Sequence, residues 1–536
     1  MSLPVTDTSA RVTSPRQVGT LIIGGGFSGL GAAIKLVQEG KHDFVVLDRG
    51  DDVGGTWRDN TYPGAACDVP SHLYSYSFAL NPDWTRSFSP QPEIRKYISS
   101  VARKYKVLDK HIFGCEVHSA RWNNETARWE LKTSKGDFVA KIVISAVGVL
   151  CEPSLPDIKG IEEFEGEIFH SAQWNHDVDL DGKRIAVIGT GASAIQIVPE
   201  LGKTAAQLDV YQRTAPWVLP RFDREYTTVE RLAFKYVPGF QKLCRTGIYW
   251  AREAQVFGLT KAPVFMEPLK FLAAQHLRLQ IKDENLRRKV TPNFQIGCKR
   301  MLISNNYYPT LTQPNVDLVT EGIAEIRKDS IVDRNGTERE IDAIVVATGF
   351  HVTDSPTFAS IFGKDGNSLA ETFEAVGMQG YKGAAVANFP NMFFLLGPNT
   401  GLGHSSMVYM IESQLNYIVD ALETIERYDI GTIEVRKDVQ QAYNRDLQAK
   451  LSASVWNTGG CASWYLDKHG NNPTQWPGFT FQFRDITRKF DLDAYRSVST
   501  SDLPVPAVVA QGQVAATSGT TDAEPTDLDD DKVAAQ

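Results

Sequence analysis

Two glycine-rich turns, each following a short apolar run, constrain this chain more than any other feature. The first run, TLIIGG, leads into residues 24–29, and the second, RIAVIG, leads into residues 189–194. A buried strand, a turn with the spacing GxGxxG or GxGxxA and a small-residue helix form a dinucleotide-binding βαβ unit. The chain is therefore predicted to be an α/β protein with two Rossmann-like dinucleotide-binding domains. The cofactor-binding residues of the two turns are predicted to be Gly24, Gly26, Phe27, Ser28, Gly29, Gly189, Thr190, Gly191, Ala192, Ser193 and Ala194.

The residue that ends the second strand of each unit predicts which nucleotide the unit binds. In the first unit, FVVLD ends at Asp48, an acid that accepts hydrogen bonds from both ribose hydroxyls of an adenosine. In the second unit, Arg213 stands at the same offset from its first glycine, or Gln212 does if the strand ends are aligned. Neither is a carboxylate. Arg213 with Thr214 favours NADP, because a guanidinium binds a 2′-phosphate as a fork. The alternative is that Arg213 is an ordinary surface cation.

The order of these patterns divides the chain into interleaved parts. Residues 114–148 alternate apolar and polar, which predicts an antiparallel meander in the first domain. Residues 223–290 lose the strand pattern, which predicts a helical insertion in the second domain. A roof over a substrate pocket and plain packing explain this insertion equally well. The predicted parts are 1–17 (flexible N-terminus), 18–150 and 342–499 (first domain), 151–183 (interdomain linker), 184–222 and 291–341 (second domain), 223–290 (helical insertion) and 500–536 (disordered acidic tail).

Charge and cysteine content narrow the class of function. The net charge is −8, but the tail from Asp502 carries seven acidic residues and one lysine, so the remaining chain is nearly neutral. A nearly neutral body gives no sign of nucleic-acid binding. No apolar run is long enough to span a bilayer, and the N-terminal residues lack the apolar core of a signal peptide. The six cysteines form no CxxC pair, which argues against a metal site or a redox-active disulfide and favours a cytoplasmic location.

Three positions carry polar groups in unusual surroundings. Asp68 is an acid among apolar neighbours in the Gly-, Pro- and aromatic-rich segment 54–74, where capping a turn is its ordinary role. Lys299 and Arg300 are adjacent cations among apolar and small residues, so they need an anionic partner unless they are a solvated pair. A predicted helix begins near His404, and its N-terminus favours negative charge on an electron-rich ring.

Two longer motifs resemble one known family. The run FEGEIFHSAQW at 164–174 matches the FxGxxxHxxxW fingerprint of type I Baeyer–Villiger monooxygenases. Segment 54–68 is similar to the second signature of that family, with GGTW followed by YPG and an aspartate. The resemblance extends over residues 18–490 in the right order, and it implies FAD in the first domain and NADPH in the second. Because the fingerprint lies in the linker, His170 is interpreted as part of a hinge and not as an acid or a base.

The resemblance also implies roles for the unexplained polar residues. Arg300 matches the active-site arginine set against the flavin, and Asp68 matches the carboxylate that pairs with it. Lys299 matches a lysine that helps Arg213 and Thr214 to hold the 2′-phosphate of NADP. The other residues predicted to contact a cofactor are Arg49, Thr56, Trp57, Asp68, Tyr74, Val117 and, beside the nicotinamide, Trp464.

The implied activity is an FAD- and NADPH-dependent Baeyer–Villiger oxygenation, which inserts one oxygen atom of O2 beside a ketone carbonyl through a C4a-peroxyflavin and gives an ester or lactone. Asn175 stands where the fingerprint has Pro or Asp, so a related flavin monooxygenase acting on sulfur or nitrogen centres is the alternative. A disulfide reductase is disfavoured because this chain lacks the cysteine pair that such an enzyme needs. A non-catalytic flavin sensor is disfavoured because it would leave Lys299 and Arg300 unexplained. The expected partners are a small-molecule ketone or sulfide and O2, without nucleic acid, and the expected state is a monomer or small homo-oligomer.

Overall fold

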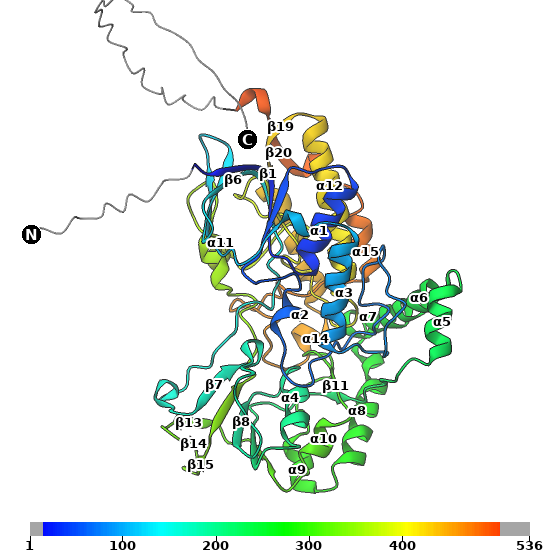
Figure 1. Cartoon of the computed structure of the whole chain (residues 1–536), viewed down its shortest axis with the longest axis vertical. Coiled ribbons are helices and arrows are strands. Elements are labelled where there is room, and N and C mark those ends of the chain that lie inside the picture. Colours follow the sequence, from blue (N-terminus) through cyan, green and yellow to red (C-terminus); the bar gives the residue numbers. More distant parts are fainter. Residues whose placement is uncertain (1–13, 504–536) are drawn as a thin grey trace, which may run out of the picture.

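The computed structural model describes residues 14–503, and its first sheet fills the upper part of the molecule (Figure 1). Its strands are β1 (Arg16–Ile23), β2 (Phe44–Leu47), β3 (His111–Ile112), β4 (Val117–Asn123), β5 (Arg128–Thr133), β6 (Phe138–Ser145), β17 (Ile361–Phe362) and β18 (Met392–Phe394). They lie in the order β17-β4-β5-β6-β1-β2-β3, with β18 paired to β6. The central pairs are parallel, whereas β4, β5 and β6 form the predicted antiparallel meander.

The second sheet lies below the first in Figure 1 and is entirely parallel. Its strands are β7 (Glu167–His170), β8 (Arg184–Ile188), β9 (Gln207–Tyr211), β12 (Val316–Val319) and β16 (Ala343–Val346). They lie in the order β12-β9-β8-β16-β7. Each sheet therefore has a glycine turn directly after one of its central parallel strands, β1 or β8, as the sequence predicts.

Three predicted boundaries need correction. The boundary at residue 342 is wrong by one strand, because β16 pairs with β8 and β7 and belongs to the second sheet. The predicted linker 151–183 contains β7, the edge strand of that sheet. Residues 16 and 17, expected to be flexible, begin β1. An apolar strand that ends in glycine has the same sequence pattern in either sheet, so only its pairing shows to which sheet it belongs. Most of the predicted N-terminal segment and acidic tail, residues 1–13 and 504–536, lies outside the described residues.

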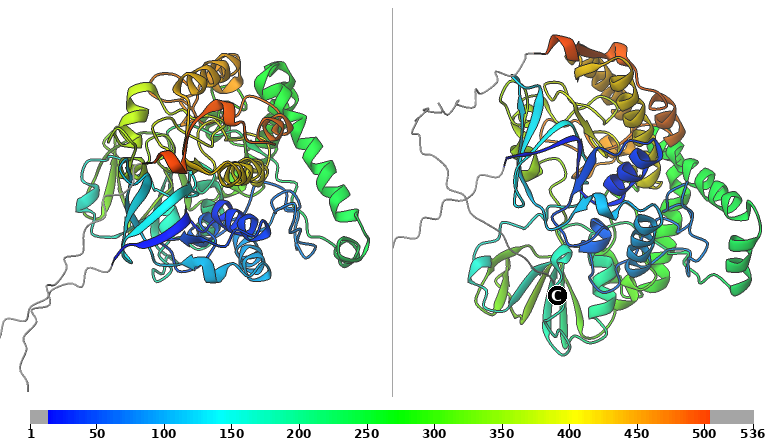
Figure 2. Two further views of the ribbon diagram at one scale, coloured as in Figure 1. Left: turned by 90° about the horizontal axis from the view of Figure 1, so that it is seen from above. Right: turned by 45° about the horizontal axis from the view of Figure 1, so that its top comes forward.

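Helices connect the strands and cover both sheets (Figures 1 and 2). Those of the predicted insertion, 223–290, are helical as expected, and α5 and α6 extend along one flank of the molecule. No helix within residues 14–503 is long and apolar enough to cross a membrane. The helices are α1 (Phe27–Gln38), α2 (Thr56–Asp59), α3 (Gln91–Lys104), α4 (Ala194–Leu201), α5 (Thr228–Tyr236), α6 (Phe240–Glu253), α7 (Gln255–Thr260), α8 (Glu267–Gln280), α9 (Glu284–Lys289), α10 (Tyr307–Thr310), α11 (Leu369–Val376), α12 (Met407–Arg427), α13 (Lys437–Leu451), α14 (Val455–Thr458) and α15 (Thr480–Ile486).

Short strands complete the connections between these elements. A parallel pair of short strands flanks the cationic residues 299 and 300 in the chain, with one strand before them and the other after them. An antiparallel three-stranded sheet flanks the second domain, and an antiparallel pair closes the first. These strands are β10 (Val218–Leu219), β11 (Leu302–Ile303), β13 (Ile323–Ile326), β14 (Ser330–Asp333), β15 (Glu338–Glu340), β19 (Ile430–Val435) and β20 (Tyr495–Ser499).

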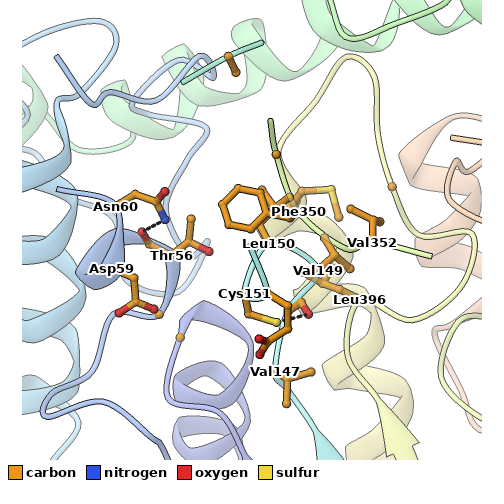
Figure 3. A pocket seen from close by; sticks show the side chains of 18 of the residues that line it. Thr56, Asp59, Asn60, Val147, Val149, Leu150, Cys151, Phe350, Val352 and Leu396 are labelled. Carbon is orange, nitrogen blue, oxygen red and sulfur yellow. Dashed lines mark hydrogen bonds between the residues drawn. The ribbon is translucent and has the colours of Figure 1, made fainter. Parts of the chain in front are cut away.

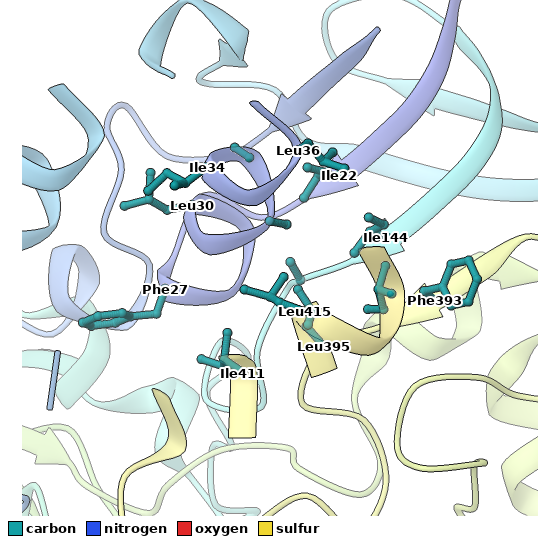
Figure 4. Packing of buried hydrophobic residues seen from close by; sticks show 14 of the residues in the cluster. Ile22, Phe27, Leu30, Ile34, Leu36, Ile144, Phe393, Leu395, Ile411 and Leu415 are labelled. Atoms are coloured by element: carbon teal, nitrogen blue, oxygen red, sulfur yellow. The ribbon is translucent and has the colours of Figure 1, made fainter. Parts of the chain in front are cut away.

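The largest apolar core lies where α1 packs between β1 and α12 (Figure 4). Leu30 and Ile34 of α1 belong to this cluster, together with Ile22 of β1 and Leu415 of α12. The helices approach closely because α1 is rich in small residues. A Cβ built on Gly31 would lie 2.9 Å from Leu415 Cδ1. This packing fixes the N-terminus of α1 at the end of β1, where the first glycine turn lies.

Gly29 should tolerate no side chain, because a Cβ there would lie 1.7 Å from the carbonyl oxygen of Gly24. We expect Gly29→Ala to destabilise the protein by at least about 1–3 kcal/mol, through overpacking of α1 against the turn. The measurement is the thermal unfolding of the purified variant. Gly247→Ala on α6 is the matched control, because a Cβ there meets nothing within 4 Å. An unchanged Tm for Gly29→Ala would show that the turn is not packed as described.

Candidate active site

A cavity of about 1140 Å³ lies between the two sheets, at the carboxyl ends of their strands. Part of its wall is formed by α2, by the loop after β6 at Val147–Cys151 and by Phe350 and Val352 after β16 (Figure 3). Ligands of doubly wound sheets bind at this edge of the strands. Among the residues predicted to form the site, Gly29, Gly189 and Ala194 do not line the cavity. The predicted residues that do line it are Gly24, Gly26, Phe27, Ser28, Asp48, Arg49, Thr56, Trp57, Asp68, Tyr74, Val117, Thr190, Gly191, Ala192, Ser193, Arg213, Thr214, Lys299, Arg300 and Trp464.

The first glycine turn leaves the N-terminus of α1 open toward the cavity. Gly26 caps this helix, and because glycine has no side chain, the capping residue does not cover the first N–H groups. Gly24 has φ of +107°, and a Cβ there would lie 2.5 Å from Ala146 O, so only glycine fits the turn. The absent Cβ of Gly55 lets a second backbone segment approach, because it would lie 3.0 Å from Gly26 Cα. Open N–H groups beside bare backbone fit a pyrophosphate.

Asp48 is held in place by a residue that sequence reasoning missed. Arg58 Nη1 donates to Asp48 Oδ1 (2.6 Å), and this ion pair is buried. The N–H groups of Gly25 and Gly50 also donate to the Asp48 carboxylate, at 2.5 and 2.7 Å. A Cβ on Gly50 would lie 2.0 Å from Arg58 Cζ, so glycine leaves the space that the guanidinium fills. These bonds fix the carboxylate on the cavity wall, where one acceptor direction stays free for a ribose hydroxyl.

Aromatic residues line the side of the cavity beside α1. Trp57 Nε1 donates to the hydroxyl of Tyr74 (2.9 Å), and the ring of Phe27 meets Tyr74 edge-on at 5.3 Å. Burial raises the pKa of Tyr74. Arg49 instead turns toward the loop after β6, where it donates to Glu152 Oε1 and to the carbonyl of Cys151, both at 2.7 Å. Thus Trp57 and Tyr74 form a fixed wall, whereas the guanidinium of Arg49 is already engaged.

Two cations lie beside the second glycine turn without an anionic partner. Lys299 and Arg213 form no ion pair or hydrogen bond with any residue in 14–503, although both line the cavity. Burial lowers the pKa of Lys299, and the nearby charge of Arg213 lowers it further. Thr190 Oγ1 donates to the carbonyl of Thr214 (3.1 Å), which holds the strand end bearing Arg213 against the turn. Two adjacent unneutralised cations fit a bound phosphate.

Asp68 and Arg300 form the central ion pair of the cavity. Arg300 Nε donates to Asp68 Oδ2 (2.7 Å) and Nη2 to Oδ1 (2.6 Å), the bidentate geometry favoured by guanidinium and carboxylate. The negative charge of Asp68 raises the pKa of Arg300, against the opposing effect of burial. For Asp68, burial raises the pKa, but the charge and hydrogen bonds of Arg300 outweigh it and lower the pKa below its usual value. The contact that the resemblance implied is therefore present, and both groups are charged.

The segment that carries Asp68 also contacts the second nucleotide unit directly. Gln196 on α4 accepts a hydrogen bond from the hydroxyl of Tyr62 (3.0 Å) and donates to the carbonyl of Ala66 (3.0 Å). A Cβ on Gly64 would lie 2.6 Å from the carbonyl oxygen of Gln196. The sequence analysis did not predict this contact, although the YPG signature lies in the segment that makes it. Gln196 therefore fixes the position of one glycine turn relative to the other.

The fingerprint residues lie away from the cavity. His170 ends β7 and is buried, and its Nδ1 accepts a hydrogen bond from the N–H of Ala172 (3.1 Å). Neither His170 nor Trp174 lines the cavity. Trp464 lies on the cavity wall with 48% of its surface exposed, and its ring meets Tyr465 edge-on at 4.5 Å. Tyr465 was missed from the sequence; burial raises its pKa to about 12.

Two of the six cysteines form a disulfide that the sequence did not indicate. Cys298 and Cys461, which are 163 residues apart, form a disulfide. Cys298 immediately precedes Lys299, and Cys461 lies three residues before Trp464. The disulfide therefore joins the two chain segments that carry the cations and the exposed tryptophan. No local CxxC pattern marks this pair, because the fold alone brings the two cysteines together. Among the described residues, Cys67, Cys115, Cys151 and Cys244 are free.

Removing this disulfide should loosen the segment that bears Trp464. We expect Cys298→Ser combined with Cys461→Ser to cost about 2–5 kcal/mol of stability, because a long loop is no longer closed. Amide hydrogen exchange should become faster across residues 459–478. Cys244→Ser, which changes a partly exposed thiol on α6, is the control. Unchanged exchange in 459–478 would mean that packing alone holds the segment.

The comparisons with known proteins agree with this geometry. Residues 17–256 match a family model described as flavin-binding monooxygenase-like. A Baeyer–Villiger monooxygenase of Pseudomonas aeruginosa is 50% identical over 90% of this chain and 92% of its own. One of Streptomyces coelicolor is 48% identical over 95% of this chain and 98% of its own. Among solved structures, cyclohexanone monooxygenase from Rhodococcus sp. Phi1 bound to NADP+ is similar with a TM-score of 0.81 and 28% identity, over 91% of this chain and 100% of that one.

Proposed function

The chain belongs to the Baeyer–Villiger monooxygenase family, and from that membership we propose that it uses FAD, NADPH and O2 to insert one oxygen atom beside a ketone carbonyl. The product is an ester or a lactone. The observation that carries the proposal is the Asp68–Arg300 pair, which lies on the wall of the cavity that both glycine turns share. A cation fixed between two nucleotide sites is suited to a reaction in which negative charge develops on oxygen.

The residues of the first domain fit FAD. The open N-terminus of α1 faces the position of a pyrophosphate, and Asp48 offers its free acceptor to the ribose. Helix α12 begins at Met407, which also lines the cavity, so its N-terminus favours negative charge on the ring system. When bound, FAD supplies the hydride acceptor and the oxygen-activating chemistry that no side chain provides.

The second domain fits NADPH. Arg213 and Lys299 would bind the 2′-phosphate, and the turn at 190–193 would approach the pyrophosphate. Gly191 is the closest-approach position of this turn, since a Cβ there meets no protein atom within 4 Å and the space is left for a ligand. The similar structure of cyclohexanone monooxygenase from Rhodococcus sp. Phi1 is bound to NADP+, which supports the same assignment.

Arg300 would act on the oxygen that gains negative charge. Its guanidinium stays protonated at any working pH and points two of its five N–H donors at Asp68, which leaves three N–H groups that Asp68 does not engage. Asp68 acts through Arg300 by fixing the plane of the guanidinium. Water must be excluded, because an open site lets activated oxygen decay to H2O2 before it reaches the substrate. The segment that carries Trp464 would exclude it.

The proposal is tested by aerobic NADPH oxidation with a panel of ketones, followed by mass spectrometry of the products. Esters or lactones one oxygen heavier than the ketone are expected. Only H2O2 would contradict the proposal, and sulfoxides without esters from matched sulfides would favour the alternative flavin monooxygenase. The cytoplasmic location and the state of a monomer or small homo-oligomer stay predictions.

The cations of the second site should decide the choice between NADPH and NADH. We expect Arg213→Gln with Lys299→Gln to lower kcat/KM for NADPH by about a hundredfold, because two charge-assisted hydrogen bonds to phosphate are lost. The kcat/KM for NADH should change little. Lys203→Gln, at an exposed lysine just after α4, is the control. An equal loss for both cofactors would mean that these residues do not read the 2′-phosphate.

A further inference from the structure

A third charged group lies behind the Asp68–Arg300 pair. Arg252, near the end of α6, lines a small cavity of about 50 Å³ together with Asp68 and Arg300. Asp68 and Arg300 line both cavities, whereas Arg252 lines the small one and not the large one, so Arg252 approaches the pair from outside the large cavity. The guanidinium of Arg252 forms no hydrogen bond or ion pair with any residue in 14–503. A partly buried arginine without a partner is unusual in a folded protein.

Arg252 differs from Arg221, a further arginine near Asp68, in having no hydrogen-bond partner among the described residues. Arg221 also interacts electrostatically with Asp68, but it donates to the carbonyls of Cys67 and Phe88, both at 3.4 Å, and lies 3.9 Å from an acidic group, Asp223. For Arg252, burial lowers the pKa, the charge of Asp68 raises it and that of Arg300 lowers it. The fold therefore keeps a cation next to another cation, with Asp68 as the shared anion.

Helix α6 holds Arg252 at this place through its next residue. The buried carboxylate of Glu253 accepts hydrogen bonds from the N–H and the hydroxyl of Thr480, at 2.9 and 2.7 Å. Glu253 also contacts His404 Nε2 at 3.2 Å. With its carboxylate engaged by these groups, Glu253 does not neutralise Arg252. It instead fixes the end of α6 and so the direction in which Arg252 points.

The charge of Arg252 has a consequence for the reacting centre. A bidentate pair such as Asp68 and Arg300 has no net charge, and its field falls off with distance faster than that of a single ion. Alone, the pair would stabilise a developing oxyanion weakly. With Arg252 on the far side of Asp68, the three groups carry a net charge of about +1. Part of the Asp68 charge is then balanced from behind, and Arg300 retains more of its positive charge toward the large cavity.

We propose that Arg252 is a positioning residue of this active site: it balances Asp68 from the side of α6 and keeps Arg300 effectively positive toward the reacting oxygen. This role rests on the proposed function. Through Arg252, helix α6 of the helical insertion contributes a positive charge to the active site. Ser405, whose buried hydroxyl has no hydrogen-bond partner among residues 14–503, lines both cavities beside these groups and offers a place for a bridging water.

The test compares Arg252→Gln, which removes the charge, with Arg252→Lys, which keeps it. We expect Arg252→Gln to lower ester formation by about tenfold to a hundredfold and to divert electrons from NADPH to H2O2. Anaerobic reduction of the bound flavin by NADPH should keep its wild-type rate. Arg252→Lys should recover most of the ester yield. Lys242→Gln, an exposed lysine on the same helix, should behave as the wild type.

A second readout is independent of turnover. Infrared spectra of the full-length apoprotein labelled with 13C-aspartate, minus those of Asp68→Asn, follow the titration of the Asp68 carboxyl. Removing Arg252 should move this titration to higher pH, because one of the cations that favour the carboxylate is lost. An unshifted titration in Arg252→Gln, or an ester yield in Arg252→Lys as low as in Arg252→Gln, would overturn the proposal. If the wild type makes no ester at all, the proposed function fails, while the titration still decides whether Arg252 acts on Asp68.

Discussion

The bidentate ion pair between Asp68 and Arg300 is the contact on which the arrangement of this molecule depends. Its partners are 232 residues apart and come from segments attached to different sheets. The pair forms only if segment 54–74 lies against the second domain, which Gln196 secures through Tyr62 and Ala66. An ion pair at such a junction adds little stability by itself, but either charge left alone there is costly. The two sheets are thereby held at the distance that a shared cavity requires.

Around this pair the site collects positive charge and leaves it uncompensated. Arg213 and Lys299 have no anionic partner within the described residues. Arg252 forms no ion pair there either, and the anion that acts on its charge is Asp68, which lines the same small cavity. The structure tolerates these cations because they face space: a large cavity on one side and a small one on the other. Such an arrangement suits polyanionic nucleotides and an oxygen that becomes negative during the reaction.

The sequence was most informative where a local pattern has one structural meaning. The two glycine turns, Asp48 at a strand end and the meander at 114–148 followed from spacing alone, and the family signatures implied the pairing of Asp68 with Arg300. Long-range contacts carry no local pattern, so the disulfide of Cys298 and the partner Arg58 of Asp48 were missed. The assignment of β16 failed for the same reason, because strand pairing is a property of the fold.

The most direct test of the central role of the pair is a single-turnover comparison of Arg300→Ala with the wild type. Flavin reduction by NADPH is followed first without O2, and the product is then measured after adding O2 and a ketone. We expect reduction to proceed normally, no ester to form and the electrons to appear as H2O2. Arg231→Ala, at an exposed arginine of α5, should retain both steps. Ester formation by Arg300→Ala at the wild-type rate would contradict the account.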